Sequence, residues 1–138
     1  MQTTIFHLAL NVTDLTKACD FYAGLLEAKQ GRRTDSWVDF NFFGHQLSLH
    51  IGTVSQSEYT GKVDNISVPM PHFGIILPLA VWQRMADKLN KANIEFIIAP
   101  TVRFEGRPGE QYTMFFIDPF GNPIEFKSFL EINEVFNQ

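Results

Sequence analysis

An internal repeat restricts the fold of this chain more than any other feature of its sequence. The segment HLALNVTDLTKACDFY begins at His7 and HFGIILPLAVWQRMADKL begins at His72, and each runs from a predicted strand through a turn into a predicted helix. A unit of this kind cannot bury both of its faces alone, so two copies are expected to pack together. We therefore predict an α+β fold in which two paired βαβββ modules form a curved mixed sheet.

A second pair of segments sets the register between the two copies. FNFFGHQLSLH aligns with IDPFGNPIEFK on a shared Phe-Gly, which makes Ser48 and Glu125 equivalent. His7 and His72 are equivalent as well. The four matching positions therefore carry three strong metal ligands and one weak ligand, since serine binds metals poorly compared with imidazole or carboxylate.

Residue periodicity predicts the elements of each module. The predicted strands are 4–12, 36–43, 46–51, 72–77, 94–98, 111–117 and 123–128. Helices are expected after Asp14, over 79–92 and, as a short piece, over 130–136. The predicted organisation is a single domain, 1–138, with module one at 1–52, an irregular crossover at 53–71 and module two at 72–138.

His7, His72 and Glu125 are the candidate metal ligands. Two imidazoles and one carboxylate leave coordination positions for substrate, oxygen or water, as in non-haem Fe(II) oxygenases. Strands also hold ligand geometry more rigidly than loops do. The alternative is that both imidazoles are core or rim residues and the carboxylate is solvated, and the pattern alone leaves this open.

His50 and Tyr112 are the candidate catalytic residues. His50 lies two positions after Ser48 and hence on the same strand face, where it could carry a proton, replace Ser48 as a ligand or form a buried polar contact. Tyr112 could donate a hydrogen bond to a substrate or simply pack.

Composition favours a globular protein that binds small molecules. A net charge of −4 without a basic cluster argues against nucleic acid as a partner, and fourteen phenylalanines suggest an apolar pocket. Cys19 is the one cysteine, which excludes an intramolecular disulfide and fits a reducing compartment. The segment MQTTIFHLAL has no basic region and too short an apolar run for a signal or a membrane span, so a cytoplasmic location is expected.

Three segments, FHLALNVTDLTKACDFYAGLL, PHFGIIL and FFIDPFGNPIEFKS, together resemble the vicinal oxygen chelate superfamily. That superfamily includes glyoxalase I, extradiol dioxygenases, and bleomycin and fosfomycin resistance proteins. The resemblance implies paired βαβββ modules that cup a metal, and a homodimer in which modules pair within one chain or between two.

The resemblance also bears on individual positions. His7, His72 and Glu125 match the ligands of extradiol-type members. Glyoxalase I commonly has a glutamate at the position of Ser48, and ring-cleaving dioxygenases carry a tyrosine at the position of Phe115. Neither of these last two family residues is present in this chain.

Three functions follow from the resemblance. The first is an extradiol-type dioxygenase that uses Fe(II) or Mn(II) on a small, aromatic substrate bound through vicinal oxygens, with His50 as acid or base. The second is a glyoxalase-like lyase or isomerase on the same site. The third is a non-catalytic binding or resistance protein.

Overall fold

The computed structural model describes residues 2–137 and divides into two compact units. The first unit takes in the chain up to Gln56 together with Asp118–Asn122. The second unit takes in Ser57–Ile117 and the chain from Pro123 onward. None of the helices within residues 2–137 is long and apolar enough to cross a membrane.

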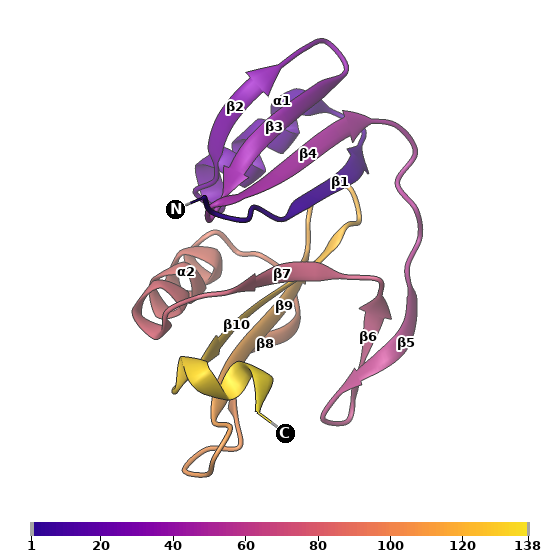
Figure 1. Ribbon diagram of the computed structural model, residues 1–138. Coiled ribbons are helices and arrows are strands. Elements are labelled where there is room, and N and C mark those ends of the chain that lie inside the picture. The colour runs from indigo at the N-terminus through magenta and orange to yellow at the C-terminus, as the bar shows by residue number, and fades with distance from the viewer. Residues whose placement is uncertain (1, 138) are drawn as a thin grey trace. The chain divides into compact units, whose positions relative to one another are not determined.

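Each unit contains one four-stranded mixed sheet with a helical segment between its first two strands (Figure 1). The first unit consists of β1 (His7–Val12), α1 (Leu15–Cys19), the π-helix η1 (Asp20–Leu25), β2 (Lys29–Arg33), β3 (Trp37–Phe42) and β4 (His45–Ile51). The second unit consists of β5 (Glu58–Val63), β6 (Ile66–Met70), β7 (Phe73–Ile76), α2 (Leu79–Lys91), β8 (Phe96–Arg103), β9 (Gln111–Ile117), β10 (Pro123–Phe129) and the 3-10 helix η2 (Ile132–Phe136).

The strand orders β1-β4-β3-β2 and β7-β10-β9-β8 are the same arrangement written twice. In both sheets the first pair is parallel and the other two pairs are antiparallel. The predicted α+β fold of two βαβββ modules is confirmed.

Alternation along the strands separates a helix-covered face from a polar face in the first unit. On β4, Leu47 and Leu49 are buried on the helix side, and on β3 Val38 and Phe40 do the same. The intervening side chains therefore share the opposite face. This face of the first sheet carries His7, Ala9, Asn11, Trp37, Asp39, Asn41, Gln46, Ser48 and His50.

The strand registers confirm the sequence alignment of the two modules. Ser48 lies opposite Ala9 on β1, and Glu125 lies opposite Gly74 on β7. Each of these partners follows the module's histidine by two residues. The same register makes Asp39, opposite Ser48, the equivalent of Phe115, opposite Glu125.

In the second unit, α2 covers one face of the sheet and leaves Glu125 on the other. The buried residues Met85 and Leu89 lie on α2, and the indole N–H of Trp82 donates to the carbonyl oxygen of Phe126 over 2.9 Å. Phe126 and Glu125 are consecutive on β10 and so point to opposite faces.

The structure differs from the sequence-based prediction mainly between the modules. Residues 53–71 were expected to be irregular, but β5 and β6 form an antiparallel hairpin there. Val63 and Val68 of this hairpin pack against Ile98 and Phe115, so the burial of two valines stabilises strands that show no clear alternation.

Individual elements differ from the prediction as well. The first strand begins at His7 instead of residue 4, and β2 was not predicted. The first helix changes to π geometry at Asp20. All five side chains of β2 are exposed, which explains why its sequence has no apolar alternation.

Candidate functional site

His72 and Glu125 face each other in the second unit. The Nε2 atom of His72 lies 3.4 Å from Oε1 of Glu125, and both side chains are largely buried. The ring of Phe115 meets the His72 ring edge to face, with 4.7 Å between centroids. An imidazole and a carboxylate therefore converge beside an apolar wall.

Hydrogen bonds fix which atoms of this pair are available. The carbonyl oxygen of Pro69 lies 2.8 Å from Nδ1 of His72, and because a carbonyl can only accept, Nδ1 carries the proton. In the neutral imidazole the lone pair is then on Nε2, which faces Glu125. The hydroxyl of Thr113 donates to Oε2 of Glu125 over 2.6 Å and leaves Oε1 toward His72.

This arrangement fits a divalent cation. Two lone-pair atoms at 3.4 Å repel each other unless a proton or a metal ion lies between them. Imidazole and carboxylate together suit Zn, Fe and Mn. Metal-binding histidines also commonly donate their second N–H to a carbonyl, as His72 does to Pro69.

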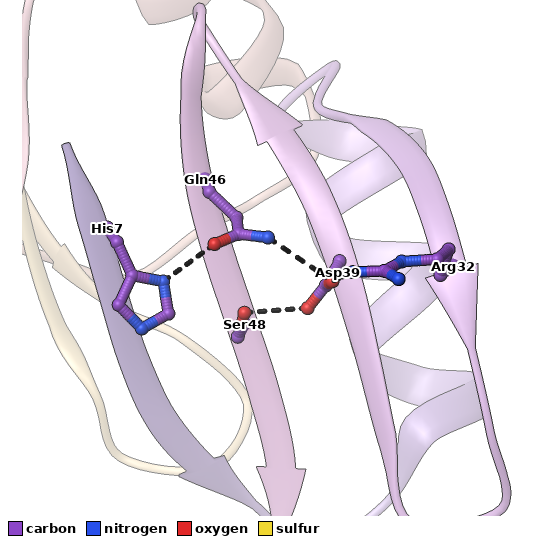
Figure 2. Close-up of polar contacts among 5 residues, drawn as sticks. All are labelled: His7, Arg32, Asp39, Gln46 and Ser48. Carbon is purple, nitrogen blue, oxygen red and sulfur yellow. Dashed lines mark hydrogen bonds and ion pairs between the residues drawn. The ribbon is translucent and has the colours of Figure 1, made fainter. Parts of the chain in front are cut away.

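His7 is held in the first unit by a row of polar side chains (Figure 2). Its Nδ1 lies 2.8 Å from Oε1 of Gln46, and Nε2 of Gln46 donates to Oδ2 of Asp39 over 3.4 Å. Asp39 also accepts a hydrogen bond from the Ser48 hydroxyl over 2.6 Å, and Nη2 of Arg32 lies 3.9 Å from Oδ2 of Asp39. The row crosses the polar face of the sheet from β1 through β4 and β3 to β2.

The predicted ligands thus fall in two units. His72 and Glu125 are together in the second unit, and His7 belongs to the first. No group of three or more His, Cys, Asp and Glu side chains within residues 2–137 is gathered so as to hold a metal ion. The three-ligand site stays a prediction.

His50 lies on the polar face of the first sheet, as predicted from its spacing to Ser48. It is exposed near the end of β4, and its ring centroid lies 6.3 Å from that of Trp37. Its main-chain oxygen accepts a hydrogen bond from the side chain of Asn11.

Tyr112 lies on the face of the second sheet that α2 covers, opposite to the face of Glu125. Its ring centroid is 5.5 Å from that of Trp82, and its hydroxyl donates to Glu110 over 2.9 Å. This hydrogen bond raises the pKa of Tyr112. The pKa of Glu110 is lowered, first by the hydrogen bond from the Gly106 backbone and then by Tyr112. The structure does not bring Tyr112 to the His72–Glu125 pair, and its catalytic role stays untested.

Sequence reasoning did not identify Thr113, Gln46 or Asp39 as functional residues. None of the three had a signal in the sequence: the Phe-Gly alignment pairs Asp39 with Phe116, and only the strand pairing makes Asp39 the equivalent of Phe115. Thr113 and Gln46 are recognised by their hydrogen bonds alone.

A comparison with known protein families identifies a family match for this chain. The sequence profile of the glyoxalase/bleomycin resistance protein/dioxygenase superfamily matches residues 4–126. The chain belongs to this superfamily. Members of the glyoxalase/bleomycin resistance protein/dioxygenase superfamily bind small-molecule substrates and commonly use divalent metals.

Solved structures of this superfamily share the fold. A glyoxalase/bleomycin resistance protein/dioxygenase from Alicyclobacillus acidocaldarius is 30% identical, with a TM-score of 0.77 and 96% of each chain covered. FosX, a fosfomycin resistance protein from Listeria monocytogenes, is 16% identical, with a TM-score of 0.70 over 97% of this chain and 98% of its own.

A lactoylglutathione lyase from Agrobacterium tumefaciens is 18% identical, with a TM-score of 0.68 over 99% of this chain and 98% of its own. At these identities, the likeness to FosX and to the lyase shows a shared fold. Among curated proteins, no sequence matches significantly.

Proposed function

We propose that this protein is a divalent-metal-dependent enzyme that binds a small substrate through two neighbouring oxygen atoms. The observation that carries the proposal is the His72–Glu125 pair, whose facing atoms are 3.4 Å apart and whose other polar atoms are engaged by Pro69 and Thr113. Membership of a superfamily whose members commonly use divalent metals supports the same conclusion.

His72, Glu125 and His7 are the proposed ligands. Pro69 holds the His72 ring in the tautomer that exposes Nε2, and Thr113 orients the carboxylate. The buried ring of Phe115 excludes water from one side of the imidazole. A bound divalent metal would polarise the two substrate oxygens and stabilise the negative charge that develops on them.

The first candidate reaction is extradiol-type ring cleavage of a catechol-like substrate with Fe(II) or Mn(II). Two histidines and one carboxylate are the donor set that leaves positions for both a chelating substrate and oxygen. In this proposal, His50 accepts the substrate proton at its imidazole nitrogen.

The second candidate is a glyoxalase-like lyase or isomerase reaction, and a specific observation favours it. Phe115 has no titratable group beside Glu125, whereas Asp39 places a carboxylate beside Ser48 at the equivalent position of the first module. A carboxylate there suits proton transfer without redox chemistry.

Metal content tests the proposal directly. Untagged protein purified without oxygen is expected to contain close to one equivalent of a divalent metal per chain, and His72→Ala is expected to lose it. His45→Ala is the matched control, because His45 lies at the start of β4 and its Nδ1 accepts from the Phe6 backbone. Equal metal content in wild type and His72→Ala would overturn the assignment.

Oxygen dependence separates the two candidate reactions. With catechol-like substrates, the dioxygenase requires oxygen and consumes it in proportion to product. Turnover that persists under strict anaerobiosis with a redox-inert metal would instead identify the lyase or isomerase.

A further inference from the structure

The polar row of the first unit consists of His7, Gln46 and Asp39, with Ser48 and Arg32 at its side. Hydrogen-bond chemistry determines which group donates and which accepts at each contact along this row. Asp39 begins it, because an ionised carboxylate has no proton to donate. The Ser48 hydroxyl is bonded to one of its oxygens over 2.6 Å, and the Gln46 amide is bonded to the other over 3.4 Å (Figure 2).

Asp39 therefore orients the Gln46 side chain. An amide has a donor end and an acceptor end, and only the NH₂ end can face a carboxylate favourably. With the NH₂ end toward Asp39, the Gln46 oxygen points to β1, where it lies 2.8 Å from Nδ1 of His7. The two ends of one amide connect two strands.

The orientation of Gln46 in turn determines the tautomer of His7. Because the Gln46 oxygen can only accept, Nδ1 of His7 carries the proton and the lone pair is on Nε2. A reversed amide would instead present N–H to Nδ1 and place the proton on Nε2, where it would block a metal. Arg32 contributes little to this control, since it is 3.9 Å from Asp39 and its side chain is 83% exposed.

His72 reaches the same tautomer by another route. Its Nδ1 is paired with the main-chain oxygen of Pro69. Unlike the Gln46 amide, a carbonyl oxygen can only accept a hydrogen bond and cannot present a donor instead. Both histidines at equivalent repeat positions therefore expose Nε2, although one relies on the main chain and the other on two side chains.

We propose that Asp39 is a positioning residue for His7, which acts through Gln46 to hold the imidazole in the tautomer that can bind a metal. The tautomer control is independent of the proposed function. Its link to metal affinity rests on the proposed function, because that link needs His7 to be a ligand.

Nitrogen-15 NMR of the imidazoles in metal-free protein, at a pH where they are neutral, tests the tautomer control. Wild type is expected to show His7 protonated on Nδ1, with the signal assigned by its loss in His7→Gln. In Asp39→Ala the Gln46 amide is free to reverse, and the Nε2–H form is expected to become the major one. Gln46→Leu, which removes the acceptor outright, is expected to do the same.

A double variant separates orientation from damage to the sheet. Glu at position 46 accepts from Nδ1 whichever way it turns, so Asp39→Ala with Gln46→Glu is expected to restore the Nδ1–H form. Asn41→Ala is the control, because Asn41 lies on the same face of β3 and bonds to the Gly44 backbone. An unchanged His7 signal in Asp39→Ala and Gln46→Leu, or no restoration in the double variant, would overturn the inference.

Metal titration of the same variants tests the link to the proposed function. Asp39→Ala is expected to bind Mn(II) about 10-fold more weakly than wild type, the usual loss when a partner of a metal ligand is removed, and the double variant is expected to recover. A changed tautomer with unchanged Mn(II) affinity would leave the positioning role of Asp39 intact and remove His7 from the proposed ligand set.

Discussion

At the scale of single residues, Glu125 is a buried carboxylate in the second unit whose charge has to be compensated by its neighbours. It is a carboxylate that is only 9% exposed, and its partners are the Thr113 hydroxyl and His72. Burial of a charge is costly unless it is paired and hydrogen-bonded, so each partner is needed to keep this carboxylate in place.

Replacement of Thr113 by valine tests this dependence. Valine keeps the shape of the side chain but leaves Oε2 of Glu125 without its donor, which is expected to lower the free energy of unfolding by about 1–3 kcal/mol. Metal affinity is expected to fall about 10-fold, because the carboxylate is no longer oriented.

Urea unfolding and metal titration measure the two effects of this substitution. Thr101→Val is the matched control, since Thr101 is the exposed cross-strand neighbour of Thr113. Equal losses of stability and of metal affinity in the two variants would contradict the role of the Thr113 hydroxyl.

At the scale of elements, the pairing of β7 with β10 brings two backbones unusually close. A Cβ atom on Gly74 would overlap the backbone carbonyl of Glu125, and a backbone atom cannot move aside as a flexible side chain can. The equivalent pair in the first unit, Ala9 with Ser48, accommodates a side chain. Glycine is therefore required at this position in the pair β7–β10 and is not required at the equivalent position of the first unit.

Gly74→Ala is expected to push β7 away from β10 and to lower the free energy of unfolding by about 1–3 kcal/mol, the range for overpacked sites. The displacement should also separate His72 from Glu125 and weaken metal binding. Gly24→Ala is the control, because a Cβ there meets no atom within 4 Å. If both variants unfold at the same urea concentration, the close approach of Gly74 to the Glu125 backbone does not affect stability.

At the scale of the whole molecule, the first unit includes a segment from far along the chain. Asp118 accepts a hydrogen bond from the buried Tyr22 hydroxyl over 2.7 Å and also from the backbone of Phe120 and Asn122. The side chain of Asn122 donates to the main-chain oxygen of Asn11. The chain thus contributes to the first unit twice, before and after most of the second unit.

The alkaline pH dependence of stability reports on this contact. Burial, the charge of Asp118 and the hydrogen bond to it raise the pKa of Tyr22 well above its ordinary value of 10.0. Below pH 10 the tyrosine is neutral in both states and its contribution is complete. Above pH 10 it ionises first in the unfolded chain, so the free energy of unfolding falls as pH rises.

Tyr22→Phe is expected to remove this part of the pH dependence. At neutral pH the variant is expected to lose about 1–3 kcal/mol, because Asp118 loses a buried donor. Chemical unfolding of both proteins from neutral pH to about pH 11 gives the difference between their free energies of unfolding as a function of pH. A difference between the two proteins that stays constant above pH 10 would contradict the assignment.

The module architecture could be predicted from the sequence because it rests on periodicity and on the repeat. Alignment on Phe-Gly gave the equivalence of Ser48 and Glu125, which the strand registers confirm. The hairpin β5–β6 could not be predicted, since its strands depend on packing of Val63 and Val68 against residues distant in sequence.

The sequence singled out two residues of the candidate site. His72 stood out because it is the repeat equivalent of His7, and Glu125 because it is the equivalent of Ser48, and the structure places His72 and Glu125 together. Their supporting residues are ordinary polar side chains or backbone atoms, Thr113 and Pro69 among them, whose role depends on three-dimensional proximity. Sequence spacing carries no signal for such partners.

The unequal support of the two histidines has an evolutionary consequence. Substitution of Gln46 or Asp39 by a single codon change alters the surroundings of His7, so selection can adjust that half of the protein in small steps. The acceptor for His72 is a main-chain oxygen, which a side-chain substitution leaves in place. Among relatives of this chain, we expect the neighbours of His7 to diversify with changes of substrate while the surroundings of His72 remain constant.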